Sequence, residues 1–116
     1  MKDNVLFFGW NHSVYGREKI SGEHFGEFVQ YLSSLQQNGT IQSFEPVFLN
    51  PHGGDINGFF LIKGDGEKLE TLQDSEDWIK HIMRANLHLE GFGLIRGIAG
   101  ELLMERMELW KNYIPE

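Results

Sequence analysis

The chain has 116 residues, the usual size of one domain, and we expect residues 1–116 to fold as a single unit. Its 17 acidic and 10 basic residues give a formal charge of −7, which disfavours binding to nucleic acid or to an anionic membrane surface. It contains no cysteine, so disulfides, thiolate catalysis and cysteine-ligated metal are excluded.

The first apolar segment predicts a strand. Val5–Trp10 is apolar, rich in aromatic residues and followed by polar residues, as a short buried strand would be. The run is too short for a signal peptide core or a membrane span, so a cytoplasmic protein is the default expectation.

The next segment predicts an amphipathic helix. Ser21 is the expected N-cap, Glu23 lies in the first turn, and Gly39 is expected to end the helix in the left-handed conformation. The apolar residues recur at helical spacing and form one stripe: Phe25, Phe28, Val29, Leu32 and Leu35.

Two apolar segments in the middle of the chain predict a β-hairpin. Residues 44–49 and Gly58–Lys63 are the expected strands, and residues 50–55 form the connection. Pro46 cannot donate to a strand ladder, so the first strand belongs at a sheet edge. The second strand contains the unbroken apolar run 59–62, which favours a central position.

The second half of the chain predicts two more helical segments. Residues 67–72 indicate a short helical turn, and a longer helix is expected to begin near Glu76, after a cap at Asp74 or Ser75, and to end at Gly91. The expected buried stripe of the longer helix consists of Trp78, Ile79, Ile82, Ala85 and Leu89.

The C-terminal part predicts a strand and a helix. Residues 92–99 contain two glycines and Arg96, which favours an edge strand. A last helix is expected to start at Gly100 and Glu101 and to end before Pro115. One side of that helix is apolar, with Leu103, Met107, Trp110 and Ile114.

The element order is β-α-β-β-α-β followed by a C-terminal helix, which is the ferredoxin-like pattern. The predicted fold class is therefore α+β, with an antiparallel sheet in the strand order 4-1-3-2. In that order the continuous apolar strands lie in the centre, while the strands with Pro46 and Arg96 lie at the edges.

The central strands also predict a partner. A sheet with helices on one face and water on the other should alternate apolar and polar residues, but residues 5–8 and 59–62 do not. About four large side chains would face water in a monomer, and full burial of each contributes about 1.5–3 kcal/mol. We expect a homodimer through the open sheet face; the alternative is that the C-terminal helix folds across it.

In element order and apolar pattern, residues 5–99 resemble the dimeric α+β barrel superfamily. Its members include cofactor-independent monooxygenases, haem-degrading enzymes, muconolactone isomerase-like proteins, stress-responsive barrel proteins and YCII-related proteins. The resemblance implies a cleft between sheet and helices in each subunit, and it selects no chemistry. No sequence pattern here calls for a cofactor.

Three polar residues are the candidate catalytic groups: His12 and Asn11 at the end of the first strand, and Arg96 inside the last one. His12 follows the first strand next to Asn11, where an imidazole could act as a general base or hydrogen-bond a substrate oxygen. The alternative is a loop histidine that caps backbone groups. Arg96 could hold a carboxylate or enolate with Glu45 as its partner; alternatively, both are edge-strand charges that oppose aggregation.

The remaining candidates would bind a ligand. Trp10, Phe8, Phe60 and Trp78 could line a flat apolar pocket, although core packing explains them equally well. His52 lies with Asp55 in the hairpin connection, where turn geometry is the alternative explanation. Two ligands are too few for a defined metal site, and we expect none there.

The other histidines are expected at the surface. His81 and His88 are seven residues apart on one helix, about 10.5 Å along its axis, which is too far to share one metal ion. They are predicted to lie on a solvated helix face, and His24 is predicted to be a surface residue as well.

The sequence therefore favours a small protein that binds an apolar or aromatic ligand in a cleft between sheet and helices. One alternative is a cofactor-independent monooxygenase or isomerase of the dimeric α+β barrel type. The other is a dimeric interaction module without a small-molecule site.

Overall fold

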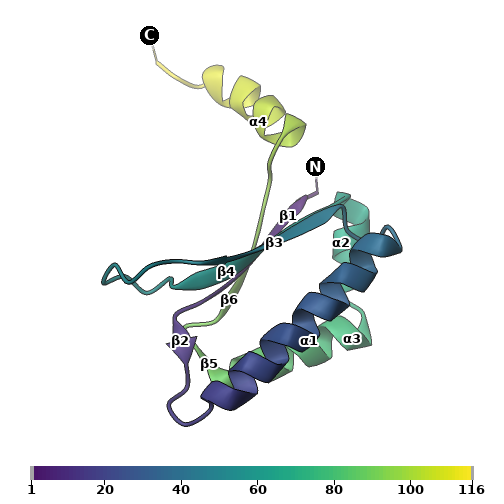
Figure 1. Ribbon diagram of the computed structural model, residues 1–116. Helices are drawn as coiled ribbons and strands as arrows, with labels where there is room; N and C mark the ends of the chain where they lie inside the picture. Colours follow the sequence, from purple (N-terminus) through teal and green to yellow (C-terminus); the bar gives the residue numbers. More distant parts are fainter. Residues whose placement is uncertain (1, 116) are drawn as a thin grey trace.

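The computed structural model describes residues 2–115 and shows an antiparallel sheet with helices packed on one face (Figure 1). The first half contains β1 (Val5–Trp10), β2 (His12–Ser13), α1 (Glu18–Gln37), β3 (Ser43–Phe48) and β4 (Gly58–Lys63). The second half contains α2 (Gly66–Gln73), α3 (Glu76–His88), β5 (Leu89–Glu90), β6 (Gly93–Gly97) and α4 (Glu101–Lys111).

The main sheet has four strands in the order β3-β4-β1-β6, and all neighbours are antiparallel. Pro46 therefore lies on an edge strand and the apolar run 59–62 lies on a central one. The predicted α+β class is confirmed, and the arrangement is compatible with a ferredoxin-like fold.

The core lies between the sheet and the helices α1, α2 and α3. On the sheet, Leu6 pairs with Ile62 and Phe8 pairs with Phe60, so these side chains share the helix-facing side. The buried apolar residues contributed by helices are Phe28, Leu32 and Leu35 of α1, Leu69 and Leu72 of α2, and Trp78 and Ala85 of α3.

The boundaries of α1 differ from the prediction at one end. The helix begins at Glu18, so Ser21 lies inside it and is not the N-cap; its hydroxyl bonds instead to His88 of α3. At the other end Gly39 adopts a φ of 82°, the left-handed conformation expected of it. In the sequence, a serine that bonds to a distant side chain therefore looks the same as a serine that caps a helix.

The second half of the chain contains more regular helix than the sequence pattern predicted. α2 is a complete helix of 8 residues because the carboxylate of Asp65 accepts from the backbone N–H of Lys68. α3 begins after Ser75 as predicted, but Ile79 is exposed and Leu89 has left the helix to join β5. The predicted buried stripe is wrong at these two positions.

A second, two-stranded sheet pairs β2 with β5, so that Ser13 lies opposite Leu89. The backbone N–H of Val14 donates to the carbonyl of His88 at 2.7 Å, which extends the contact to the end of α3. This small sheet ties the segment after β1 to the segment after α3. Its two-residue strands gave no periodic signal in the sequence.

The C-terminal helix α4 stands away from the other elements (Figure 1). It contains no buried residue, so it does not cover the open sheet face of its own chain. The radius of gyration is 16.1 Å, whereas a compact chain of this length would have about 13 Å. Within residues 2–115, none of the helices is long and apolar enough to cross a membrane.

Phe28 joins the layers, because its ring contacts Phe8 and Phe60 of the sheet and Trp78 of α3. We predict that Phe28→Ala lowers the free energy of unfolding by about 3–5 kcal/mol, measured by urea denaturation. Tyr15→Ala is the control: Tyr15 is 96% exposed, and its loss should change stability by less than about 0.5 kcal/mol. Equal effects of the two substitutions would contradict this core.

Candidate functional site

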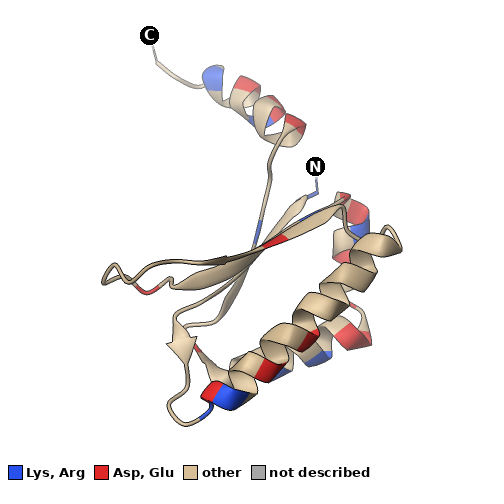
Figure 2. Ribbon diagram, viewed as in Figure 1, with Lys and Arg blue, Asp and Glu red and all other residues tan. Residues whose placement is uncertain are grey.

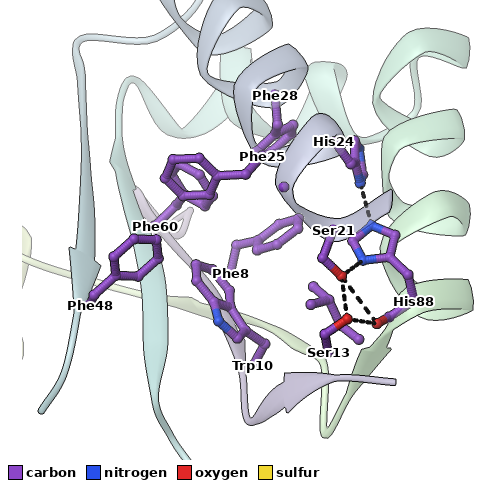
Figure 3. Close-up of a pocket in the computed structure, with 12 residues that line it drawn as sticks. Phe8, Trp10, Ser13, Ser21, His24, Phe25, Phe28, Phe48, Phe60 and His88 are labelled. Carbon is purple, nitrogen blue, oxygen red and sulfur yellow. Dashed lines mark hydrogen bonds between the residues drawn. The ribbon is translucent and has the colours of Figure 1, made fainter. Parts of the chain in front are cut away.

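A pocket of about 320 Å³ opens between the helix-facing side of the sheet and the beginning of α1 (Figure 3). Most of its wall is aromatic, and one corner is polar. The aromatic residues are Phe8, Trp10, Phe25, Phe28, Phe48 and Phe60; the polar corner consists of Ser13, Ser21, His24 and His88.

The aromatic rings hold one another in place. Phe60 packs against Trp10 with ring centroids 5.7 Å apart and against Phe25 at 5.2 Å. Phe8 meets Phe60 edge to face at 5.7 Å. Phe48 contacts Phe25 yet is 70% exposed, which places it at the mouth. Such a wall suits a flat apolar molecule.

Two serines form the part of the polar corner nearest β2. The Ser13 and Ser21 hydroxyl oxygens are 2.7 Å apart, and Ser21 Oγ lies 2.8 Å from Nδ1 of His88 (Figure 3). The β2–β5 sheet and the end of α3 bring Ser13 to this place, while the first turn of α1 brings Ser21. Two neighbouring segments and the distant end of α3 therefore meet at one hydroxyl pair.

Three histidines continue from the serines as a hydrogen-bonded row. His88 Nε2 lies 2.7 Å from His24 Nδ1, and His24 Nε2 lies 2.9 Å from His81 Nδ1. His24 and His88 are each 3% exposed and His81 is half-buried. The prediction of a solvated surface is therefore wrong for His24 and His88. His81 and His88 are two turns apart on α3, which leaves room for His24 of the neighbouring helix between them. Residue spacing along one helix cannot reveal a partner on another helix.

Burial lowers the pKa of His24 to about 4, and the nearby charge of Arg84 acts in the same direction. Burial, followed by the Arg84 charge, also lowers the pKa of His81 and of His88. Arg84 itself forms an ion pair with Glu27. Near neutral pH the three imidazoles are therefore uncharged, with one N–H each.

Three of the predicted ligand-binding residues, Phe8, Trp10 and Phe60, line this pocket. Trp78 does not line it; its side chain packs in the core on the α3 side of Phe28. His52 lies in the exposed hairpin connection, where Nε2–H donates to the carbonyl of Ile56 at 2.6 Å and Nδ1 accepts from a backbone N–H. The role of that imidazole is to shape the turn.

The predicted catalytic residues lie outside the pocket wall. His12 is exposed, and its Nδ1–H donates to the carbonyl of Ser13 at 2.7 Å. Asn11 accepts from the side chain of Asn57 at 2.6 Å, which fastens the end of β1 to the hairpin.

Arg96 and Glu45 do not meet. They lie on strands at opposite edges of the sheet, about 14 Å apart at three strand spacings. The register also places them on opposite faces, since Arg96 pairs with Leu6 on the helix side whereas Glu45 pairs with Leu61 on the open side. The suggested partnership is therefore wrong.

No group of three or more histidine, aspartate or glutamate side chains suited to a metal ion occurs within residues 2–115. His24, His81 and His88 bond to one another in sequence and so do not converge on a common point. Comparisons of the chain with protein-family models, with curated proteins and with solved structures gave no match.

The buried histidines predict acid sensitivity. Because the pKa of His24 is about 4 in the folded chain and 6.5 ordinarily, the unfolded chain binds more protons between these values. The free energy of unfolding should therefore be fully retained above pH 6.5 and fall as the pH decreases toward 4. Urea denaturation at several pH values should show this slope in the native protein and a smaller slope in His24→Gln.

The control is His12→Gln, which removes an exposed imidazole. We expect the same pH slope in this variant as in the native chain. A slope that His24→Gln leaves unchanged would show that His24 does not titrate as the structure indicates.

Proposed function

We propose that the protein binds a small, flat aromatic molecule that carries one polar group. The observation that carries the proposal is the pocket itself, in which aromatic rings surround the apolar space and Ser21 and His88 occupy one corner. Its volume of about 320 Å³ lies at the lower end of ordinary ligand pockets, which suits one or two rings.

The polar corner supports recognition of a hydroxyl or carbonyl group. A serine hydroxyl both donates and accepts, so Ser13 and Ser21 could bond either substituent. The aromatic wall would supply most of the affinity through burial, and the serines would orient the molecule. His12, Asn11 and Arg96 lie off the pocket wall, so the geometry gives less support to a monooxygenase or isomerase that uses them.

We also propose that two chains assemble as a dimeric α+β barrel of ferredoxin-like subunits. On the open face Phe7 pairs with Leu61 and Ile95, and it stacks on Phe59 at 4.8 Å. The strands carry few charged residues compared with the helices (Figure 2). A second copy would cover this face with an identical apolar surface.

The position of α4 supports the same assembly. An isolated helix of 11 residues is marginally stable in water, so α4 needs a surface to pack on. Its exposed apolar residues include Met104, Leu109 and Trp110, each more than half exposed. A second copy could receive this helix, which has no buried residue within the described residues 2–115.

Filling the pocket should abolish ligand binding. Gly22 lines the pocket, and a Cβ there would meet no atom within 4 Å, so Gly22→Leu projects a side chain into open space. We predict at least about a tenfold loss of affinity for 2-acetylnaphthalene, measured by two-dimensional NMR titration. This probe offers two rings to the aromatic wall and a carbonyl to the serines.

The matched control is Gly26→Leu. Gly26 lies one helical turn further along α1, has equally open surroundings and does not line the pocket. Both substitutions should leave stability unchanged or raise it, because glycine is unfavourable inside a helix. Equal affinities in the two variants would remove the pocket as the binding site.

The native chain should have twice the monomer mass of 13.4 kDa in size-exclusion chromatography with light scattering. Ile95→Glu should shift it to the monomer, because Ile95 is 60% exposed on the open face. Ile79→Glu replaces an isoleucine that is 43% exposed on α3, away from that face, and should leave the dimer intact. A native monomer at micromolar concentration would refute this assembly.

A further inference from the structure

We infer that Ser21 and His88, continued by His24 and His81, form a proton relay that acts on a ketone in the pocket. The relay would remove a proton from the carbon next to the carbonyl of a small aromatic ketone. This inference rests on the proposed ligand pocket and adds a reaction to it.

The groups form a chain of hydrogen bonds with two distinct ends, and Ser13 joins it at Ser21, where the two hydroxyl oxygens lie 2.7 Å apart. From the pocket, the chain runs from Ser21 to His88 at 2.8 Å and to His24 at 2.7 Å (Figure 3). It continues from His24 to His81 at 2.9 Å. Ser21 and His88 belong to the pocket wall, so the first end is open to a ligand. His81 is half-buried, so the second end lies near solvent.

The available protons can fill this chain in either direction, and the proposed step uses the direction that starts with donation by Ser21. Three neutral imidazoles carry three N–H groups, one for each histidine. If Ser21 donates to His88 Nδ1, His88 Nε2–H donates to His24 Nδ1 and His24 Nε2–H donates to His81 Nδ1. His81 Nε2–H then remains at the outer end. Ser21 Oγ accepts the O–H of Ser13 with one lone pair, and its second lone pair is available to the pocket.

The proposed step conserves protons and electrons. The C–H bond of the ketone breaks, and its proton goes to Ser21 Oγ as the proton of Ser21 moves to His88 Nδ1. The electron pair of the C–H bond becomes the carbon–carbon π bond of the enolate, and the carbonyl π pair moves to oxygen. His88, now an imidazolium, can pass its Nε2 proton through His24 and His81, from which water accepts the last proton.

The arrangement has the parts of an activated hydroxyl: a hydroxyl, a base in contact with it and a third group that orients the base. His24 is the orienting group, since its Nδ1 accepts a hydrogen bond from Nε2–H of His88. Ser13 Oγ lies 2.7 Å from Ser21 Oγ and is also on the pocket wall, so its one O–H could turn from Ser21 Oγ to the enolate oxygen. The hydroxyl at the end of the row therefore contacts the base and also lines the pocket.

The charges around the row favour passing the proton on over retaining it. From α3, Arg84 opposes an added positive charge on all three imidazoles, and Arg17, before α1, does so for His88. Glu27 of α1 favours protonation of His24 and His81, and Asp77 of α3 favours it for His81 alone. The carboxylates therefore act at the outer part of the row, in the direction of release.

The test is hydrogen–deuterium exchange at the methyl group of 2-acetylnaphthalene in D2O, followed by proton NMR. We expect the native protein to accelerate exchange at least about tenfold over buffer. Ser21→Ala and His88→Gln should each abolish the acceleration, whereas Ser21→Thr, which keeps a hydroxyl, should retain part of it. The controls are Ser34→Ala, an exposed serine on the same helix, and His12→Gln, an exposed histidine; both should exchange at the native rate.

His81 is a positioning residue, because it does not line the pocket. His81→Gln should lower the maximal exchange rate without changing the dissociation constant of the probe, a separation that a general loss of structure would not produce. Nitrogen NMR of the intact protein provides a second test that needs no variant. The bound probe should shift the His88 Nδ1 resonance, and the absence of any shift would overturn the inference.

The outcomes separate this inference from the proposed function. If the probe binds in the pocket but does not exchange, the relay is refuted and the binding function stands. If the probe does not bind, both are refuted for this class of ligand. Native exchange in a folded Ser21→Ala variant would also refute the relay.

Discussion

The contact of α1 with α3 above the sheet is the constraint on which the rest of the structure depends. Its apolar half is the packing of Phe28 against Trp78, and its polar half is the insertion of His24 between two imidazoles of α3. Unpaired imidazoles would be costly in this position. Among the described residues no buried side-chain nitrogen or oxygen lacks a hydrogen-bond partner, so the contact can be both dry and polar.

Local patterns were sufficient for the sheet because strand signals are local. Pro46 and the unbroken run 59–62 indicated edge and centre correctly, since each depends on the strand's own hydrogen bonds and burial. The β2–β5 sheet was not predictable from periodicity, because two-residue strands contain no period. Its existence depends on where α3 ends, which is a property of the whole fold.

The site was harder to predict than the fold. The aromatic wall was found in part, because Phe8 and Phe60 belong to paired strands whose alternate residues face the helices. The polar corner was missed, because Ser21 carries the sequence signal of a helix cap and His24 that of a surface residue. Each has a partner more than sixty positions away, and without aligned relatives no feature of a single sequence joins such distant residues.

The two faces of the sheet carry different apolar residues, one face toward the pocket and the other toward the open side. Along β1, Phe8 faces the pocket, whereas Phe7 faces the open side. If two subunits join through their open sides, their pockets point away from each other, with two sheets between them. Ligand occupancy of one subunit would then have no direct route to the other, and binding to the dimer would be non-cooperative, with a Hill coefficient of about one.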